Sequence, residues 1–306
     1  MKIVFMGTPA FAVPSLKALI REHRVVGVFC QPDKPVGRHQ NRLQPPPVKV
    51  CALDHEIPVC QPERLRDAAA LAVLRELDPE LIVVAAYGRI LPDDILALPP
   101  KGCINVHSSL LPKYRGAAPI NWAILNGEAE TGVTIMHMAS ELDAGDVILQ
   151  RSTPIGPDED AETLYHRLAE LGGEMVVEAV AQIGAGTATR TPQDPKQATL
   201  APMLSKTLSP IDWTQSAQAI HDKIRGLLPW PAASTDIISG EPMKLYRSSL
   251  SGQSAGAHPG VIVSAGQQGI DIVCGDGQLL RILELQPPGK KRMSAAAYLA
   301  GHPIKL

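Results

Sequence analysis

The segment CINVH at 103–107 holds two polar side chains that could act in catalysis. Asn105 and His107 are two residues apart on a predicted strand. Because side chains alternate across a strand, both point to one face, while Ile104 and Val106 point to the other. The pair lies at the carboxyl end of the strand, where ligands bind on open α/β sheets. A lone Asn or His there could equally satisfy neighbouring backbone groups.

A second polar site lies in ELDAGDVILQ at 141–150. Asp143 and Asp146 fall in a Gly-containing turn between two β-like runs, TGVTIMHM and VILQRS. We interpret Asp146 as a turn residue whose carboxylate bonds its own backbone. Asp143 is the candidate partner of His107.

An Asn, a His and an Asp on neighbouring strand ends suit the attack of an amine on a carbonyl. The Asn105 amide and a protonated His107 can each donate a hydrogen bond to the oxyanion, and each donor contributes on the order of 3 kcal/mol. A carboxylate favours the cationic imidazole, and Asp143 can also accept the proton that the amine releases. This chemistry needs no Ser, Cys or Lys nucleophile and no metal.

The elements that must position these residues form an alternating pattern. Apolar runs predict strands at 2–6, 24–30, 57–60, 81–86 and 103–107, and helical patterns occupy about 10–21, 63–76 and 160–183. Apolar strands that alternate with helices predict a doubly wound, mostly parallel α/β sheet with helices on both faces. The turn MGTPAF at 6–11 has one of the three glycines of a dinucleotide motif, which argues against a nicotinamide cofactor.

The composition and the hydrophobic pattern change after the predicted helix at about 160–183. Residues 184–210 are rich in Gly, Thr and Pro and look like a linker. A helix at about 214–227 and the β-like runs STDII, PMKLYRS, GVIVSA, GIDIVC and QLLRILELQ follow, as in a small OB-like barrel. We therefore expect an α/β domain at 1–189, a linker at 190–206 and a β-barrel at 207–306.

Composition narrows the class of protein. The chain is 45% hydrophobic and 20% charged, and no apolar run approaches the length of a membrane helix. It opens directly on a strand, so we expect a bacterial-type cytoplasmic protein without a leader, and a monomer. Five cysteines without a CxxC pair argue against disulfides and structural zinc. The net charge is -2, but residues 201–306 hold 10 Lys and Arg against 7 Asp and Glu, which permits an RNA-facing side.

Together the motifs Asn-x-His at 105–107, SLLP at 109–112, RGAAP at 115–119 and LDAGD at 142–146 resemble formyltransferases that use 10-formyltetrahydrofolate. The resemblance implies that Asn105, His107 and Asp143 are catalytic. It also implies folate contacts from Ser109, Leu110, Leu111 and Pro112, and from Tyr87, Gly88, Ile90 and Leu91 in VVAAYGRIL at 83–91. This chain reads HSSLLP where many relatives read HGSLLP, a change that should leave the chemistry intact.

Members of this family differ in the acceptor of the formyl group. RGAAPINWAILNGEAETGVTIM at 115–136, the loop at 31–50, and SKTLSPIDW, LPWPA, GDG and LQPPGKKRMSA in the last third resemble the branch that acts on initiator methionyl-tRNA. The resemblance implies that N-formylmethionyl-tRNA is made for translation initiation. The implied tRNA contacts are Arg38, Arg42, Lys206, Lys290, Lys291 and Arg292. Relatives usually read GRGKKL where this chain reads GRHQNRL, so Arg38 keeps its place but lysines are lost.

Two alternatives stay open. A formyltransferase that acts on a sugar nucleotide or a glycinamide nucleotide would need neither the basic loop nor the GKKRMSA segment. A non-catalytic tRNA-binding protein could use the barrel alone, although the Asn–His–Asp set argues against it. We interpret Trp230, which stands between prolines, as a packing residue rather than a base-stacking one.

Overall fold

The computed structural model describes residues 1–36 and 42–306, and the chain forms two compact units. Unit 1 contains residues 1–116, 131–153 and 165–200, and unit 2 contains residues 117–130, 154–164 and 201–306. Each unit is therefore assembled from separate stretches of the sequence. The Arg38 position falls outside the described residues.

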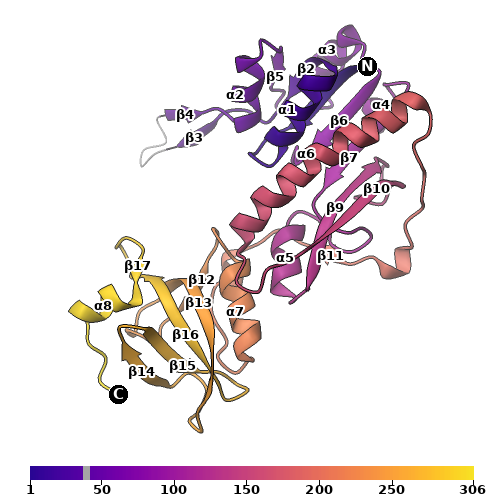
Figure 1. Cartoon of the computed structure of the whole chain (residues 1–306). Coiled ribbons are helices and arrows are strands. Elements are labelled where there is room, and N and C mark those ends of the chain that lie inside the picture. Colours follow the sequence, from indigo (N-terminus) through magenta and orange to yellow (C-terminus); the bar gives the residue numbers. More distant parts are fainter. Residues whose placement is uncertain (37–41) are drawn as a thin grey trace. The chain divides into compact units, whose positions relative to one another are not determined.

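Unit 1 is built on a seven-stranded sheet with the order β10-β9-β7-β6-β1-β2-β5 (Figure 1). Its strands are β1 (Lys2–Gly7), β2 (Arg24–Phe29), β5 (Val59–Cys60), β6 (Leu81–Ala85), β7 (Cys103–His107), β9 (Glu130–His137) and β10 (Val147–Pro154). The five strands from β5 to β7 run parallel. β9 runs antiparallel to β7 and sets Thr134 opposite His107. The predicted mostly parallel α/β sheet is confirmed.

Helices cover both faces of this sheet, as the apolar strands predicted. On one face, a Cβ added to Gly172 would lie 2.8 Å from Cγ1 of Val106, which places α6 (Ala161–Ala185) against β7. α1 (Ala12–Glu22) lies beside it, because a Cβ added to Gly173 would lie 3.1 Å from the backbone of Pro14. The other face packs Val4, Met6, Ile82 and Val84 of the strands against Leu74 of α3 (Ala68–Leu77) and Ile95 of α4 (Asp93–Leu96). The alternation of β7 puts Asn105 and His107 on this second face.

Unit 2 contains α5 (Pro119–Leu125), α7 (Ala217–Gly226), α8 (Ala295–Gly301) and a second sheet. The strands of that sheet are β12 (Ala233–Thr235), β13 (Met243–Ser254), β14 (Ile262–Gly266), β15 (Gly269–Val273), β16 (Gln278–Gln286) and β17 (Met293–Ser294). They pair antiparallel in the order β12-β13-β16-β15-β14, with β17 on β16. This arrangement is consistent with the predicted small barrel. Apolar residues of α7 and α8 share one core with the strands.

Several details differ from the sequence prediction. α3 begins at Ala68 rather than at 63, because a turn precedes it. The run STDII is a strand only to Thr235, and Ile237 and Ile238 lie in a turn. Trp230, which was expected to pack, is 49% exposed.

Shorter elements complete the chain. β3 (Lys34–Val36) and β4 (Arg42–Gln44) pair antiparallel, and α2 (Pro47–Asp54) follows β4. β8 (Arg115–Gly116) pairs with β11 (Leu200–Ala201). The segment predicted as a linker holds two 3₁₀ turns, η1 (Pro195–Gln197) and η2 (Lys206–Leu208). None of the helices in the described ranges is long and apolar enough to cross a membrane.

Candidate active site

β7 delivers two polar side chains to the end of the sheet. Asn105 is half-buried and His107 is 5% exposed, whereas Ile104 and Val106 are buried against the helices of the opposite face. The carboxamide of Asn105 forms no hydrogen bond with any other residue that the structure describes. It is therefore available as a donor on this strand.

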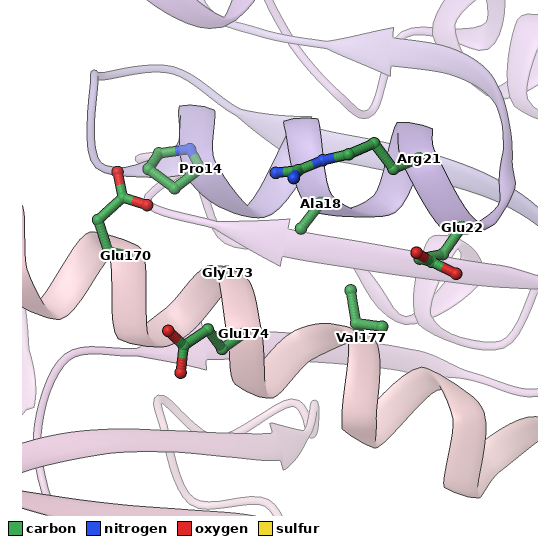
Figure 2. Close-up of a pocket in the computed structure, with 8 residues that line it drawn as sticks. All are labelled: Pro14, Ala18, Arg21, Glu22, Glu170, Gly173, Glu174 and Val177. Atoms are coloured by element: carbon green, nitrogen blue, oxygen red, sulfur yellow. The ribbon is translucent and has the colours of Figure 1, made fainter.

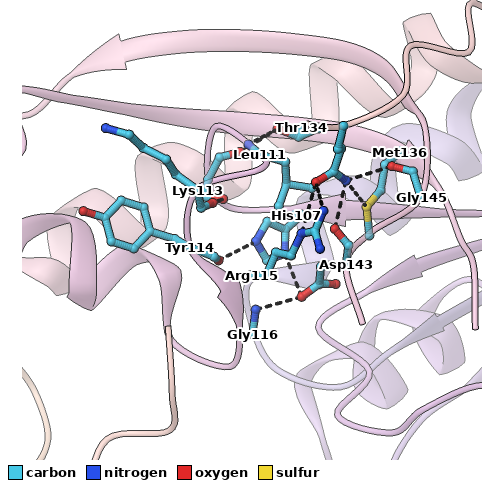
Figure 3. Close-up of polar contacts among 12 residues, drawn as sticks. His107, Leu111, Lys113, Tyr114, Arg115, Gly116, Thr134, Met136, Asp143 and Gly145 are labelled. Atoms are coloured by element: carbon cyan, nitrogen blue, oxygen red, sulfur yellow. Dashed lines mark hydrogen bonds and ion pairs between the residues drawn. The ribbon is translucent and has the colours of Figure 1, made fainter. Parts of the chain in front are cut away.

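The two ring nitrogens of His107 face different partners (Figure 3). Nε2 lies 3.0 Å from the backbone carbonyl of Tyr114. Since a carbonyl oxygen only accepts, Nε2 carries the hydrogen of this bond. Nδ1 lies 3.8 Å from Oδ2 of Asp143, which is too far for a hydrogen bond but close enough for an ion pair when the ring is protonated. Nδ1 is consequently the nitrogen that remains for chemistry.

Asp143 lies in a tight turn that the backbone geometry makes specific. Its φ of 49° is left-handed, a conformation that Asp tolerates better than most residues. Oδ2 accepts a hydrogen bond of 2.8 Å from the amide of Gly116, so the carboxylate is bound to the loop after β7. A Cβ at Gly145 would lie 1.8 Å from the carbonyl oxygen of His137, and only glycine fits there. The structure thus brings Asp143 to His107.

Asp146 has a structural place, although not the one predicted. Its carboxylate lies 3.6 Å from Nη1 of Arg190, and its carbonyl accepts a hydrogen bond from the amide of His137. Among the described residues, no bond joins this carboxylate to its own backbone. Asp146 therefore ties the turn to neighbouring segments.

The segment Ser109–Pro112 is held in shape from inside. Ser109 Oγ donates to the carbonyl of Lys113 at 2.6 Å, and Thr134 Oγ1 donates to the carbonyl of Ser109 at 2.6 Å. Gln150 Nε2 donates to Thr134 Oγ1 and to the carbonyl of Leu111, each at 2.9 Å. Ser109 and Leu111 are buried, and Leu110 and Pro112 are half-buried. Sequence analysis missed Thr134 and Gln150, although a Thr inside an apolar strand is a signal.

The predicted pterin loop divides into core residues and surface residues. Tyr87 is 2% exposed, and burial raises its pKa to about 12. Its carbonyl accepts hydrogen bonds from Thr8 Oγ1 at 3.0 Å and Gln31 Nε2 at 3.2 Å. Leu91 also lies in the core, whereas Gly88 turns the chain with a φ of 79° and Ile90 is 77% exposed. Tyr87 and Leu91 thus anchor the loop, and Gly88 and Ile90 offer its surface.

Gln193 and Arg115 are site residues that sequence analysis did not identify. The Gln193 amide nitrogen donates to the carbonyls of Asp143 and Gly145, each at 2.8 Å. Its oxygen accepts from Nη2 and Nε of Arg115 at 2.9 and 3.2 Å. Arg115 is buried, and its Nη1 lies 3.5 Å from Glu141. Nothing in TPQDPKQ distinguishes Gln193, because its partners lie far away in the sequence.

The predicted tRNA contacts are exposed where the structure describes them. Arg42 lies on β4, Lys206 on η2, and Lys290, Lys291 and Arg292 precede β17. Arg292 differs from its two neighbours. Its Nε donates to Glu284 at 2.6 Å, and its guanidinium carbon lies 4.7 Å from the centre of the Tyr246 ring.

One of the cations in the 31–50 loop is already paired with an acidic residue. Lys49 lies on α2, and its Nζ is 2.8 and 2.9 Å from the two oxygens of Asp33. Gln61 Nε2 also donates to Asp33, at 2.8 Å. The charge of Lys49 is therefore balanced by Asp33 within the chain. Lys34 and Arg42 are the exposed cations in the described part of the loop.

A groove between α1 and α6 lies away from this site (Figure 2). It is lined by Pro14, Ala18, Arg21, Glu22, Glu170, Gly173, Glu174 and Val177. These helices cover the sheet face of Val106, whereas Asn105 and His107 point to the other face. The groove therefore has no part in the chemistry of His107 and Asp143.

The cysteine thiols are poor nucleophiles and poor metal ligands. All five are free, and burial raises the pKa of Cys103 to about 12 and the pKa values of Cys30 and Cys274 to about 11. Such thiols stay protonated at neutral pH. Within residues 1–36 and 42–306, no group of three or more His, Cys, Asp or Glu side chains is placed to hold a metal ion.

Known proteins match both parts of the chain. The family model described as formyl transferase matches residues 1–180, and the model described as formyl transferase, C-terminal domain, matches residues 203–303. A Trichlorobacter lovleyi protein named methionyl-tRNA formyltransferase is 52% identical over 306 residues, which span all of this chain and 95% of that protein. A Moorella thermoacetica protein of the same name is 51% identical and covers 99% of this chain and 97% of its own.

Solved structures of more distant proteins share the fold. The sugar 3N-formyl transferase WlaRD, crystallised with dTDP and 5-N-formyl-THF, has a TM-score of 0.71 at 20% identity and covers 95% of this chain and 99% of its own. An N-formyltransferase from Helicobacter canadensis in complex with folinic acid and dTDP-3-aminofucose has a TM-score of 0.72 at 21% identity, with 92% and 98% covered. At such identities the likeness concerns the fold alone.

Proposed function

The chain belongs to the formyl transferase family, and from this premise we propose that it transfers a formyl group from 10-formyltetrahydrofolate to the α-amino group of initiator methionyl-tRNA. The product, N-formylmethionyl-tRNA, would serve translation initiation. One observation carries the acceptor: relatives named methionyl-tRNA formyltransferase are about half identical to this chain over its full length. We assign catalysis to residues 1–189, tRNA binding to 207–306 and the connection to 190–206.

The residues present fit a folate co-substrate. One structural neighbour was crystallised in the presence of 5-N-formyl-THF and another is in complex with folinic acid, which supports a folate site in the same fold. The Asn105 amide has no hydrogen-bond partner among the described residues and lies at the end of β7, while Gly88 and Ile90 present backbone and apolar surface nearby in the predicted pterin loop. The bound folate supplies the formyl group on its N10. The segment Ser109–Pro112 would contact it with a preformed backbone.

The contacts of each proposed catalytic residue support a different role in the reaction. Asn105 donates its amide hydrogen to the formyl oxygen as negative charge develops there. His107 cannot use Nε2 for this purpose, because that nitrogen is bound to the Tyr114 carbonyl. Nδ1 therefore donates the second hydrogen bond. Asp143, 3.8 Å from Nδ1, stabilises the positive charge on the ring by Coulomb attraction.

Asp143 also has a second task in this proposal. Gly116 binds Oδ2 and fixes the carboxylate, so its position is set before the acceptor arrives. The carboxylate accepts the proton that the attacking amine releases, directly or through one water. The buried His107 and the nearly buried Asp143 make this exchange local, because bulk water has little access to either group.

The acceptor would be held by exposed cations. Arg42, Lys206, Lys290 and Lys291 are exposed, as side chains that contact phosphates must be. Arg38 and Arg292 join them in the proposal, and Arg292 contributes less than the lysines because Glu284 already pairs with it. The two full-length relatives described above carry the name methionyl-tRNA formyltransferase at about 50% identity, whereas the two nucleotide-sugar enzymes match at 20 and 21% identity, which favours the tRNA acceptor over a sugar or glycinamide nucleotide. A monomer in the cytoplasm remains our prediction.

Formyl transfer to three acceptors tests the function directly. Charged initiator methionyl-tRNA, charged elongator methionyl-tRNA and a glycinamide nucleotide are each incubated with the protein and 10-formyltetrahydrofolate. Fast transfer to the initiator tRNA alone is the expected result. Transfer to the nucleotide would overturn the acceptor assignment, and transfer to none of them would overturn the proposed activity.

A further inference from the structure

Residues 189–200, here called the strap, run beside both loops that hold the proposed catalytic side chains. At its first end the strap pairs with the start of β10. Thr191 and Val147 exchange two backbone hydrogen bonds of 2.8 and 3.1 Å, and Thr189 Oγ1 donates to the carbonyl of Ile148 at 2.9 Å. These bonds fix the strap next to the turn that contains Asp143.

In its middle the strap reaches into that turn through Gln193. The side-chain amide donates to the carbonyls of Asp143 and Gly145 and accepts from Arg115, so its oxygen and its nitrogen are both engaged. The carbonyl of Asp143 belongs to a residue in the left-handed region. A conformation of this kind persists only where neighbours hold it in place. Gln193 is such a neighbour.

At its other end the strap bonds to the loop that orients His107. The backbone amide of Tyr114 donates to Thr199 Oγ1 at 2.9 Å, and the amide of Arg115 donates to the carbonyl of Thr199 at 2.8 Å. The Tyr114 carbonyl is the acceptor of the His107 Nε2 hydrogen. Thr199 therefore holds the Tyr114–Arg115 peptide group, whose carbonyl orients the imidazole of His107.

We propose that the strap sets the separation between His107 and Asp143, with Gln193 and Thr199 as positioning residues. The proposal rests on the function proposed above. The 3.8 Å between Nδ1 and Oδ2 leaves the two groups apart, although a small shift of either loop would bring them into a hydrogen bond. Gln193 and Thr199 link the strap to both loops at once through their side chains. A segment expected to be a passive linker is thus part of the active-site frame.

A merely structural strap predicts a different outcome from a positioning strap. If the strap only attaches one segment to another, its variants lower the melting temperature or the folded fraction, and each folded molecule still reacts at the normal rate. If it positions the side chains, the rate per folded molecule falls. Single-turnover formylation, expressed per site titrated with 5-formyltetrahydrofolate, separates the two.

Gln193→Met is the main variant, because methionine keeps the length of the side chain and removes its donors and its acceptor. We expect the single-turnover rate constant per titrated site to fall between about tenfold and a hundredfold, as for a small misplacement of reacting groups. The KM for tRNA should stay unchanged. Gln197→Met is the matched control, since the side chain of Gln197 lies in the same strap but bonds only to Asp194 within the described chain.

Thr199 offers a second, conservative pair of variants. Thr199→Val preserves shape and removes the acceptor of the Tyr114 amide, so we expect a loss of about fivefold, the effect of one hydrogen bond. Thr199→Ser restores the hydroxyl and should restore the rate. A hydroxyl-dependent rate at unchanged melting temperature is not expected of a passive segment.

The possible results distinguish a failure of the positioning role of the strap from a failure of the proposed formyl transfer. If the unaltered protein formylates initiator methionyl-tRNA and Gln193→Met does so at the same rate per titrated site, the strap has no positioning role. If the loss follows only the folded fraction, the role is structural, and the proposal is also overturned. If the unaltered protein transfers no formyl group, the proposed function itself fails.

Discussion

The end of β7 and the basic run before β17 were both predicted to contact substrate, but they differ in burial and in the partners of their side chains. His107 and Asp143 are nearly buried, and each has a backbone group as a fixed partner. Lys290 and Lys291 are exposed and form no ion pair with another described residue. The chemistry needs groups that are placed in advance, whereas attraction to phosphates tolerates mobile charges.

Arg292 lies between these two extremes. It belongs to the basic run by sequence, yet Glu284 neutralises it and its guanidinium stacks on Tyr246. Holding a side chain in one geometry in this way is typical of the catalytic region. Three adjacent cations thus divide into two that are free for a partner and one that braces the barrel.

The largest expected effect is at the buried residues near the end of β7. His107→Ala removes the donor that Nδ1 supplies and should lower kcat by about a thousandfold, within the range for removal of an acid–base group or an oxyanion donor. Because no tRNA contact is proposed for His107, tRNA affinity should be unchanged in a filter-binding assay. His258→Ala, which alters an exposed histidine, is the matched control. Near-normal turnover of His107→Ala would show that its roles are misassigned.

Asp143→Asn tests whether charge or position matters at this end. Asn keeps an oxygen that can accept the Gly116 hydrogen bond, so the turn should persist and the melting temperature should change little. Loss of the negative charge removes both the stabilisation of the imidazolium and the proton acceptor. We expect kcat to fall by about a hundredfold. A variant that keeps its rate would restrict Asp143 to holding the turn.

Sequence periodicity identified the part of the site that depends on local rules. The alternation in CINVH puts Asn105 and His107 on one face, and the apolar strands predict the parallel sheet, both as the structure has them. Gly145 could also have been noted, since a glycine two residues after Asp143 can mark a close backbone approach, here to the carbonyl of His137. Each of these features is decided within a few residues, where backbone sterics and side-chain alternation act.

The remaining features depend on contacts between distant segments. Gln193 is one polar residue in a polar, proline-rich stretch, and only the fold brings it to Asp143. Lys49 is one basic residue of a loop that the sequence shows as largely basic, but the fold pairs it with Asp33. The sequence thus shows which charged and polar side chains a segment carries. Tertiary contacts decide which of them remain free to bind a partner.

The smallest expected effect is at the exposed end, and it sharpens the comparison. Lys290→Ala combined with Lys291→Ala should weaken tRNA binding several-fold at unchanged kcat. The slope of log affinity against log salt should decrease by about one unit for each phosphate that the variant no longer binds. Lys305→Ala, at another exposed lysine of the same unit, serves as the control for charge alone.

Arg292→Ala should behave differently from this lysine pair, because its charge is already balanced by Glu284. The variant removes an ion pair and a cation–π interaction, so its main effect should be a lower melting temperature by an amount that corresponds to about 1 kcal/mol. The salt dependence of tRNA binding should change less than in the lysine variant. Equal salt slopes for the two variants would mean that Arg292 leaves Glu284 to bind phosphate, and the division of the basic run into free and bracing cations would then be wrong.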